Sequence, residues 1–147
     1  MGVIRTFDIL DRLNNRFPQD DILAGKQNGK WVQYSTKDYK DYVNYVSYGL
    51  LSMGFKKGDK IATIANNRPE WNFVDFGMAQ AGIVHVPIYP TISESDYRHI
   101  LRHSGVKAVI ISNKLIYNKI RNLTERIRKI REIFAFDDVP GVRSWVE

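Results

Sequence analysis

Short apolar runs rich in β-branched residues alternate with amphipathic stretches along most of the chain. Four such runs begin near residues 60, 83, 106 and 132, a spacing of about two dozen residues. Each run suits a strand that is buried on both faces, and the stretches between them carry apolar residues at helical spacing. This recurrence is typical of a strand followed by a crossover helix. It predicts an α/β fold over residues 36–136, with a mainly parallel sheet and helices on both faces.

The stretch Lys60–Thr91 has the clearest signals at the joints between its elements. Its first strand is predicted at Ile61–Ala65. Pro69 fits the first position of a helix, where no backbone N–H is needed, and Gly82 suits the position that ends it. Val84-His85-Val86 then begins a second strand. These signals predict a strand–helix–strand unit with a right-handed crossover.

Residues 1–35 precede these repeats and predict a helix followed by a β-hairpin. Thr6 is the predicted cap of the first helix, which runs within residues 1–20. The hairpin is predicted from Asp21 to Ser35, turning at Asn28-Gly29, since both residue types tolerate the positive φ angles of a tight turn. The apolar stripe of the first helix is formed by Phe7, Leu10, Leu13 and Phe17.

Two helices have capping boxes that can be read directly from the residues. A long helix from Thr36 to Met53 begins with Ser35 and Asp38, and a later helix begins with Ser93 and Asp96. Gly54 and Gly105 suit the left-handed positions beyond their ends. Further strands are predicted at Val106–Ile111 and Ile133–Phe136.

Composition places limits on the class of protein. The 147 residues and 44% hydrophobic content suit a single domain with a sizeable core. The absence of Cys excludes a disulfide framework and fits a reducing compartment. No apolar run approaches the roughly 20 residues that span a bilayer, and the N-terminus lacks the apolar core of a signal peptide. The predicted location is therefore cytoplasmic.

The last residues, 137–147, read as a truncated tail. Trp145 has no further predicted element to pack against. We therefore expect the natural chain to continue, so that residues 1–147 form a single partial domain.

The sequence contains few signals of catalytic chemistry. It has no GxxxxGK[ST] or GxGxxG phosphate loop and no GxSxG nucleophile elbow. His99 and His103 have the spacing of metal ligands on a helix, but no carboxylate is placed to complete a site. We predict two surface histidines, no metal site and no catalytic residue.

The segment Lys114–Arg131 predicts a basic amphipathic helix. From Lys114 to Glu132 seven cations stand against two carboxylates. Such a helix can bind an anionic membrane or nucleic acid through its cations. Alternatively, its apolar stripe packs on the sheet and the cations face solvent. The second interpretation is favoured because the stripe is needed for a crossover between two strands. The apolar stripe contains Ile116, Ile120, Leu123, Ile127 and Ile130.

Several short motifs together resemble one enzyme family. Gly58–Ala62 reads GDKIA, Asn67–Trp71 reads NRPEW and Val86–Thr91 reads VPIYPT. In this order they resemble the GDRVA, NRPEW and VPxYPT motifs of the AMP-forming acyl-CoA synthetases, most closely the long-chain fatty-acid branch. The similarity covers about residues 5–136. Further matching pieces are Trp31–Ser35 with Asp38-Tyr39, the helix Ser93–Gly105 and the strand Val106–Ser112.

This resemblance implies an enzyme that uses ATP and Mg²⁺ to convert a fatty acid to an acyl-adenylate and then transfers the acyl group to coenzyme A. The family's phosphate loop and C-terminal domain lie downstream of its N-terminal region and have no counterpart in these residues. We therefore expect an N-terminal fragment that is inactive alone and binds none of these cofactors tightly. The resemblance also allows a homodimer, since long-chain members of the family can dimerise through their N-terminal region. The basic helix Lys114–Arg131 allows weak peripheral contact with the inner face of a membrane. No nucleic-acid partner is expected.

The sequence is also compatible with two other functions. One is a self-contained doubly wound module that binds a small ligand, and the other is an adenylate-forming enzyme for aryl or amino acids. A membrane or nucleic-acid binder ranks last, because it depends on the basic helix alone.

Polar and ring side chains follow two neighbouring predicted strands, where parallel sheets bind their ligands. We expect these residues to border the substrate cleft of the complete enzyme. The alternative is a structural role, in which Arg68 pairs with Glu70 and the Asn side chains cap the turn. The candidate residues are Asn66, Asn67, Arg68, Glu70, Pro87, Tyr89 and Thr91.

Overall fold

The computed structural model describes residues 3–27 and 29–146, and these form two compact units. The first, here called the helical unit, contains the chain up to Lys57 together with Asn67–Ile83. The second, the sheet unit, contains Gly58–Asn66 and the chain from Val84 onward. Each unit is therefore built from two separate stretches of sequence.

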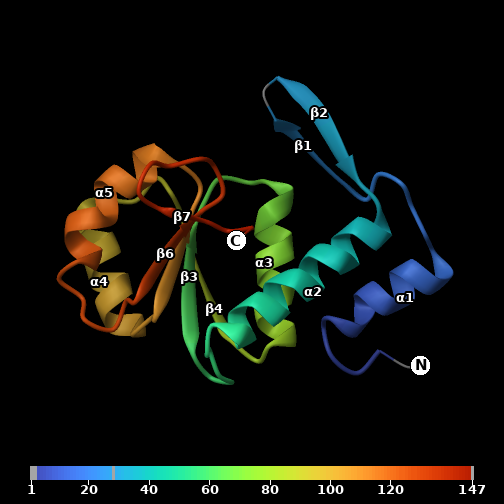
Figure 1. The fold of residues 1–147 in the computed structure, drawn as a ribbon, viewed down its shortest axis with the longest axis horizontal. Helices are drawn as coiled ribbons and strands as arrows, with labels where there is room; N and C mark the ends of the chain where they lie inside the picture. The colour runs from blue at the N-terminus through green and yellow to red at the C-terminus, as the bar shows by residue number, and fades with distance from the viewer. Residues whose placement is uncertain (1–2, 28, 147) are drawn as a thin grey trace. The chain divides into compact units, whose positions relative to one another are not determined.

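The helical unit combines three helices with one hairpin (Figure 1). Its strands β1 and β2 are antiparallel, with Leu23 opposite Tyr34. The predicted turn residue Asn28 lies outside the described residues, and Gly29 has the expected positive φ of 79°. The elements are α1 (Asp8–Arg16), β1 (Leu23–Gln27), β2 (Lys30–Tyr34), α2 (Thr36–Ser52) and α3 (Pro69–Gln80).

Aromatic rings fill the core of the helical unit. Phe73 of α3 is fully buried and stacks on Tyr42 of α2, with ring centroids 4.7 Å apart. Tyr34 of β2 meets the same Phe73 edge-on at 5.1 Å, and Tyr39 lies at 5.5 Å. Phe73 therefore joins the hairpin, α2 and α3, and each of these ring pairs stabilises the core beyond the effect of the area that the rings bury.

The sheet unit holds a five-stranded sheet in the order β4-β3-β5-β6-β7. Every pairing in it is parallel, which confirms the predicted α/β class. Pro87 lies within β4, opposite Thr63, where a residue without an N–H is tolerated because β4 is an edge strand. The elements are β3 (Lys60–Ile64), β4 (Val84–Ile88), α4 (Glu94–Ser104), β5 (Ala108–Ile111), α5 (Lys114–Thr124), β6 (Glu132–Ala135) and β7 (Arg143–Ser144).

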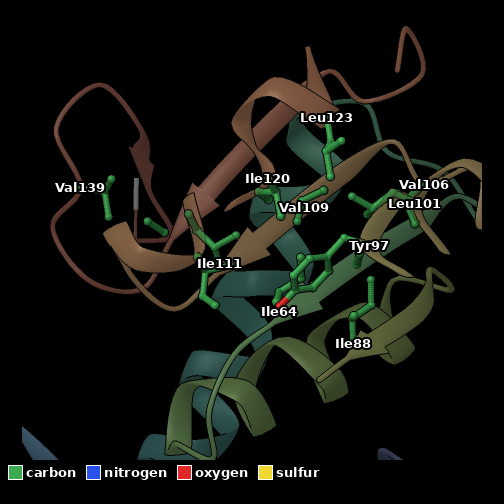
Figure 2. Packing of buried hydrophobic residues seen from close by; sticks show 13 residues of the cluster. Ile64, Ile88, Tyr97, Leu101, Val106, Val109, Ile111, Ile120, Leu123 and Val139 are labelled. Carbon is green, nitrogen blue, oxygen red and sulfur yellow. The ribbon is translucent and has the colours of Figure 1, made fainter. Parts of the chain in front are cut away.

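Side chains of α4 and α5 cover one face of this sheet (Figure 2). Tyr97 and Leu101 of α4 and Ile120 of α5 are completely buried with Val109 and Ile111 of β5. This is the alternating pattern that a covered strand requires, since every second side chain points to the same face. Helices on both faces stay a prediction, because α3, which follows β3 in sequence, belongs to the helical unit.

The caps of the later helices confirm the sequence prediction. Ser35 and Asp38 form a reciprocal capping box at α2, and Ser93 and Asp96 form one at α4. The cap predicted for the first helix is wrong. This helix begins at Asp8, whose carboxylate accepts the N–H groups of Ile4 and Arg5 at 3.2 and 2.9 Å, and Thr6 has no capping role.

The basic helix predicted over Lys114–Arg131 is shorter than expected. Helix α5 ends at Thr124, whose hydroxyl donates to the carbonyl oxygens of Ile120 and Arg121. Residues 125–131 then form turns. A helix continued to Arg131 would leave no residues to bring the chain back to β6, which begins at the next position.

The tail 137–147 contains a strand that the sequence prediction missed. Strand β7 is only two residues long and pairs with β6 at Phe134 and Ala135. The ring of Trp145 meets that of Phe136 edge-on at 5.5 Å, and the backbone N–H of Trp145 donates to the carbonyl oxygen of Ala135. Trp145 therefore has an element to pack against within the sheet unit, contrary to the expectation.

Candidate functional site

The seven predicted site residues are divided between the two units. Asn66, Pro87, Tyr89 and Thr91 belong to the sheet unit. The other three, Asn67, Arg68 and Glu70, belong to the helical unit.

In the sheet unit, exposed polar side chains follow the carboxyl ends of β3 and β4. These strands end together, with Ile64 opposite Ile88. Asn66 follows β3 and is exposed, as are Tyr89 and Thr91 after β4. Tyr89 is 79% exposed, so its ring is free to meet a ligand rather than the core. Pro87 does not follow the strand as predicted, since it lies inside β4.

The same edge carries residues that the sequence reasoning missed. The backbone N–H of Ser112, just after β5, donates to the carbonyl oxygen of Ile64 at 3.0 Å, and the carbonyl oxygen of Ser112 accepts the N–H of Asp137 at 3.0 Å. Ser112 therefore lies between the ends of β3 and β6. Within the described part of the chain its hydroxyl oxygen is buried without a hydrogen-bond partner. Asn66 is selected because it comes just after a predicted strand. The same rule, applied to the strand that ends at Ile111, also selects Ser112.

In the helical unit, Arg68 and Glu70 pair closely at the start of α3. The Arg68 Nε donates to Glu70 Oε2 at 2.9 Å and a terminal nitrogen donates to Oε1 at 3.0 Å. Gln27 Nε2 donates to the same Oε1 at 3.2 Å and to the Tyr34 hydroxyl at 2.9 Å. The interpretation in which Arg68 pairs with Glu70 is therefore confirmed.

The environment of Glu70 keeps its carboxylate charged. Its burial favours the neutral form, but the hydrogen bonds from Arg68 and from the backbone outweigh that effect and hold the pKa below the ordinary value of 4.5. Burial, together with the nearby Glu70 charge, raises the pKa of Tyr34. A carboxylate that is 5% exposed and already hydrogen-bonded on both oxygens is suited to holding the hairpin against α3. It is poorly suited to exchanging protons with a substrate.

The two histidines of α4 lie side by side on the surface. His99 and His103 are exposed, and their rings lie parallel with centroids 5.7 Å apart. Among the described residues, no three metal-binding side chains gather in a group that could hold an ion. The described helices likewise include none long and apolar enough to cross a membrane.

Comparison with known proteins places this arrangement in a family. A sequence model described as AMP-binding enzyme matches residues 10–145. The long-chain-fatty-acid–CoA ligase heimdall of Drosophila melanogaster is 28% identical over 129 residues, which are 82% of this chain and 19% of that protein. The mitochondrial medium-chain acyl-CoA ligase ACSF2 of Rattus norvegicus is 26% identical over 120 residues, again 82% of this chain and 19% of the relative.

Solved structures show the same fold at lower identity. The anthranilate CoA ligase AuaEII, in complex with anthranoyl-AMP, aligns with a TM-score of 0.76 at 19% identity, covering 96% of this chain and 26% of that one. A benzoate CoA ligase from Burkholderia xenovorans LB400 aligns with a TM-score of 0.78 at 17% identity, covering 97% and 27%. The chain thus spans about a fifth of the length of the curated relatives that it matches.

Proposed function

This chain belongs to the family of AMP-binding enzymes, and we propose that it is the N-terminal part of an ATP-dependent long-chain fatty-acid–CoA ligase. The family match over residues 10–145 is the observation that carries this proposal. In the proposed reaction a fatty acid is converted to an acyl-adenylate, and coenzyme A then takes the acyl group. The 147 residues alone do not complete either step.

The relatives support a fatty acid over an aryl acid. The two curated relatives described above are named as long-chain and medium-chain acyl-CoA ligases, at 28% and 26% identity. The aryl-CoA ligases are similar at 19% and 17%, which supports the shared fold alone. Activation of an aryl or amino acid is the alternative, and a direct comparison of acids in the full-length enzyme separates them.

The described residues do not fit a role in holding Mg²⁺ or the phosphates of ATP. No group of metal-binding side chains is found among them, and the sequence has no phosphate loop. The carboxylate of Glu70 is enclosed by its partners. We infer that the contribution of this chain is to build a wall of the substrate site, with Asn66, Tyr89 and Thr91 as the residues that meet substrate.

Two incubations test the proposal. The 147-residue chain with ATP, Mg²⁺ and palmitate is expected to release no pyrophosphate above background. The longer protein that contains it is expected to form palmitoyl-CoA, and to use palmitate more efficiently than benzoate. Turnover by the short chain would overturn its assignment as an inactive part, and a preference for benzoate would overturn the fatty-acid assignment.

A substitution in the longer protein tests the proposed contact between this chain and the substrate. Tyr89→Ala is expected to raise KM for the fatty acid, because the exposed ring that follows β4 is lost. Tyr48→Ala is the matched control, since Tyr48 of α2 is also exposed, at 63%. Equal kinetics for the Tyr89 variant and the control would exclude substrate contact at Tyr89.

A further inference from the structure

Cations gather at the amino end of the sheet, opposite the edge proposed to meet substrate. The N–H of Lys107, just before β5, donates to the oxygen of Lys60 at the start of β3, at 2.8 Å. The N–H of Arg131, just before β6, donates to the oxygen of Lys107 at 2.7 Å. The adjacent strands β3, β5 and β6 therefore each begin at or just after a basic residue. These residues are far apart in sequence, so only the strand order shows that they lie together.

The early end of α5 adds further cations to this region. Because α5 stops at Thr124, the connecting residues 125–131 turn back toward β6 rather than extending the helix. Lys129 Nζ lies 3.4 Å from the point that a Cβ on Gly105 would occupy, at the C-terminal end of α4. We call the following residues the basic rim: Lys60, Arg102, Lys107, Arg126, Arg128, Lys129 and Arg131.

Nearby carboxylates offset less than half of this charge. Asp59 pairs with Lys107 at 2.6 Å, and Glu132 pairs with Arg143 at 3.7 Å. Glu125 is exposed in the connecting segment. Against the seven cations of the rim these three acids leave an excess of four positive charges, in a chain whose net charge is +6. We propose that the basic rim binds the surface of an anionic lipid bilayer.

The chemistry of the rim favours a bilayer over nucleic acid. Single-stranded nucleic acid is held by aromatic side chains on which bases stack, in addition to charge. Across residues 98–131 the sequence has one Phe, Tyr or Trp residue, Tyr117, and it is partly buried. Clusters of Lys and Arg that lack exposed Phe, Tyr or Trp rings suit the charged headgroups of a leaflet. The choice of a bilayer also rests on the proposed function, because a fatty-acid substrate partitions into membranes.

Sedimentation with vesicles tests the proposal without measuring enzyme activity. The 147-residue chain is mixed with vesicles of phosphatidylcholine containing 30% phosphatidylserine, and with vesicles of phosphatidylcholine alone. Binding to the anionic vesicles is expected at 0.1 M salt. It should be lost at 1 M, where the screening length falls from about 10 Å to about 3 Å. No binding to the neutral vesicles is expected.

Two variants of equal net charge distinguish binding through the basic rim from binding that depends on net charge alone. Replacing Arg126, Arg128 and Arg131 together by Gln is expected to weaken binding roughly 100-fold, about fivefold for each cation removed. The matched control replaces Arg12, Arg16 and Lys30 by Gln. These cations of the helical unit are also exposed, and their loss gives the same net charge. The control is expected to bind within about twofold of the parent chain.

Three outcomes would overturn the proposal. One is that anionic vesicles at 0.1 M salt do not retain the parent chain. Another is that the control variant loses as much affinity as the rim variant. The third is tighter binding to a single-stranded RNA 20-mer than to vesicles at equal phosphate concentration, which would assign the rim to nucleic acid. Because no outcome depends on ligase turnover, a failure here is distinct from a failure of the proposed enzyme function.

Discussion

At the scale of single residues, Glu70 is a buried charge of the helical unit. Its carboxylate accepts from Arg68 on both oxygens and from Gln27 on one, while its exposed fraction is 5%. Glu70→Gln keeps the shape but removes the charge, so the Arg68–Glu70 ion pair is lost. We expect the free energy of unfolding to fall by about 2 kcal/mol in urea titration. Asp41→Asn, which breaks the exposed Lys37–Asp41 pair, is the control and should cost about 0.5 kcal/mol or less.

The same residue predicts a dependence of stability on pH. The pKa of Glu70 in the folded chain lies below its ordinary value of 4.5, so folding favours the charged form. This contribution is complete above pH 4.5 and is lost as the pH falls through the lower, folded-state value. The difference in urea midpoint between the parent chain and Glu70→Gln should therefore be large at pH 7 and shrink progressively below pH 4.5. A difference that grows on acidification would contradict the ion-pair role.

At the scale of elements, two helical glycines provide a matched test of how α2 and α3 pack. A Cβ at Gly77 would lie 2.6 Å from the Val46 side chain and 3.1 Å from the Val43 oxygen, whereas a Cβ at Gly49 would meet nothing within 4 Å. Gly77→Ala should lower the free energy of unfolding by about 1–3 kcal/mol. Gly49→Ala should raise it by about 0.5–1 kcal/mol, because Ala favours a helix interior. Urea titration of both variants checks the pair, and equal effects would mean that α2 and α3 do not pack this closely.

Where a helix begins could be predicted from the sequence when the start is set by residues a few positions along the chain. The capping boxes at Ser35 and Ser93 are local, since each hydroxyl bonds an N–H three positions along the chain. The end of α5 is not local. Its apolar pattern continues through Ile127 and Ile130. The return to β6 nevertheless ends the helix at Thr124, because sheet pairing fixes where the next strand starts.

The candidate site shows the same limit at a larger scale. The rule that ligands bind beyond strand ends selects Asn66, Tyr89 and Thr91, and all three are exposed just after β3 and β4. It cannot show that Glu70 is enclosed, because its partner Gln27 is 43 residues away in sequence. Nor can it show that Arg131 lies beside Lys107, since that contact depends on strand order. Local spacing thus identifies turns and strand ends, while long-range pairing decides which side chains remain available.

At the scale of the whole molecule, the chain passes between the two units more than once, so a single cut does not release a complete unit. The sheet unit needs Lys60–Ile64, because β3 pairs with both β4 and β5. A chain reduced to residues 84–147 would lose this strand and the burial of Ala62 and Ile64 in the core around α4 and α5. We expect it to show no cooperative thermal transition by circular dichroism, whereas residues 1–147 unfold cooperatively. A cooperative transition of the shorter chain would mean that β4 and β5 reach a stable sheet without the strand that separates them.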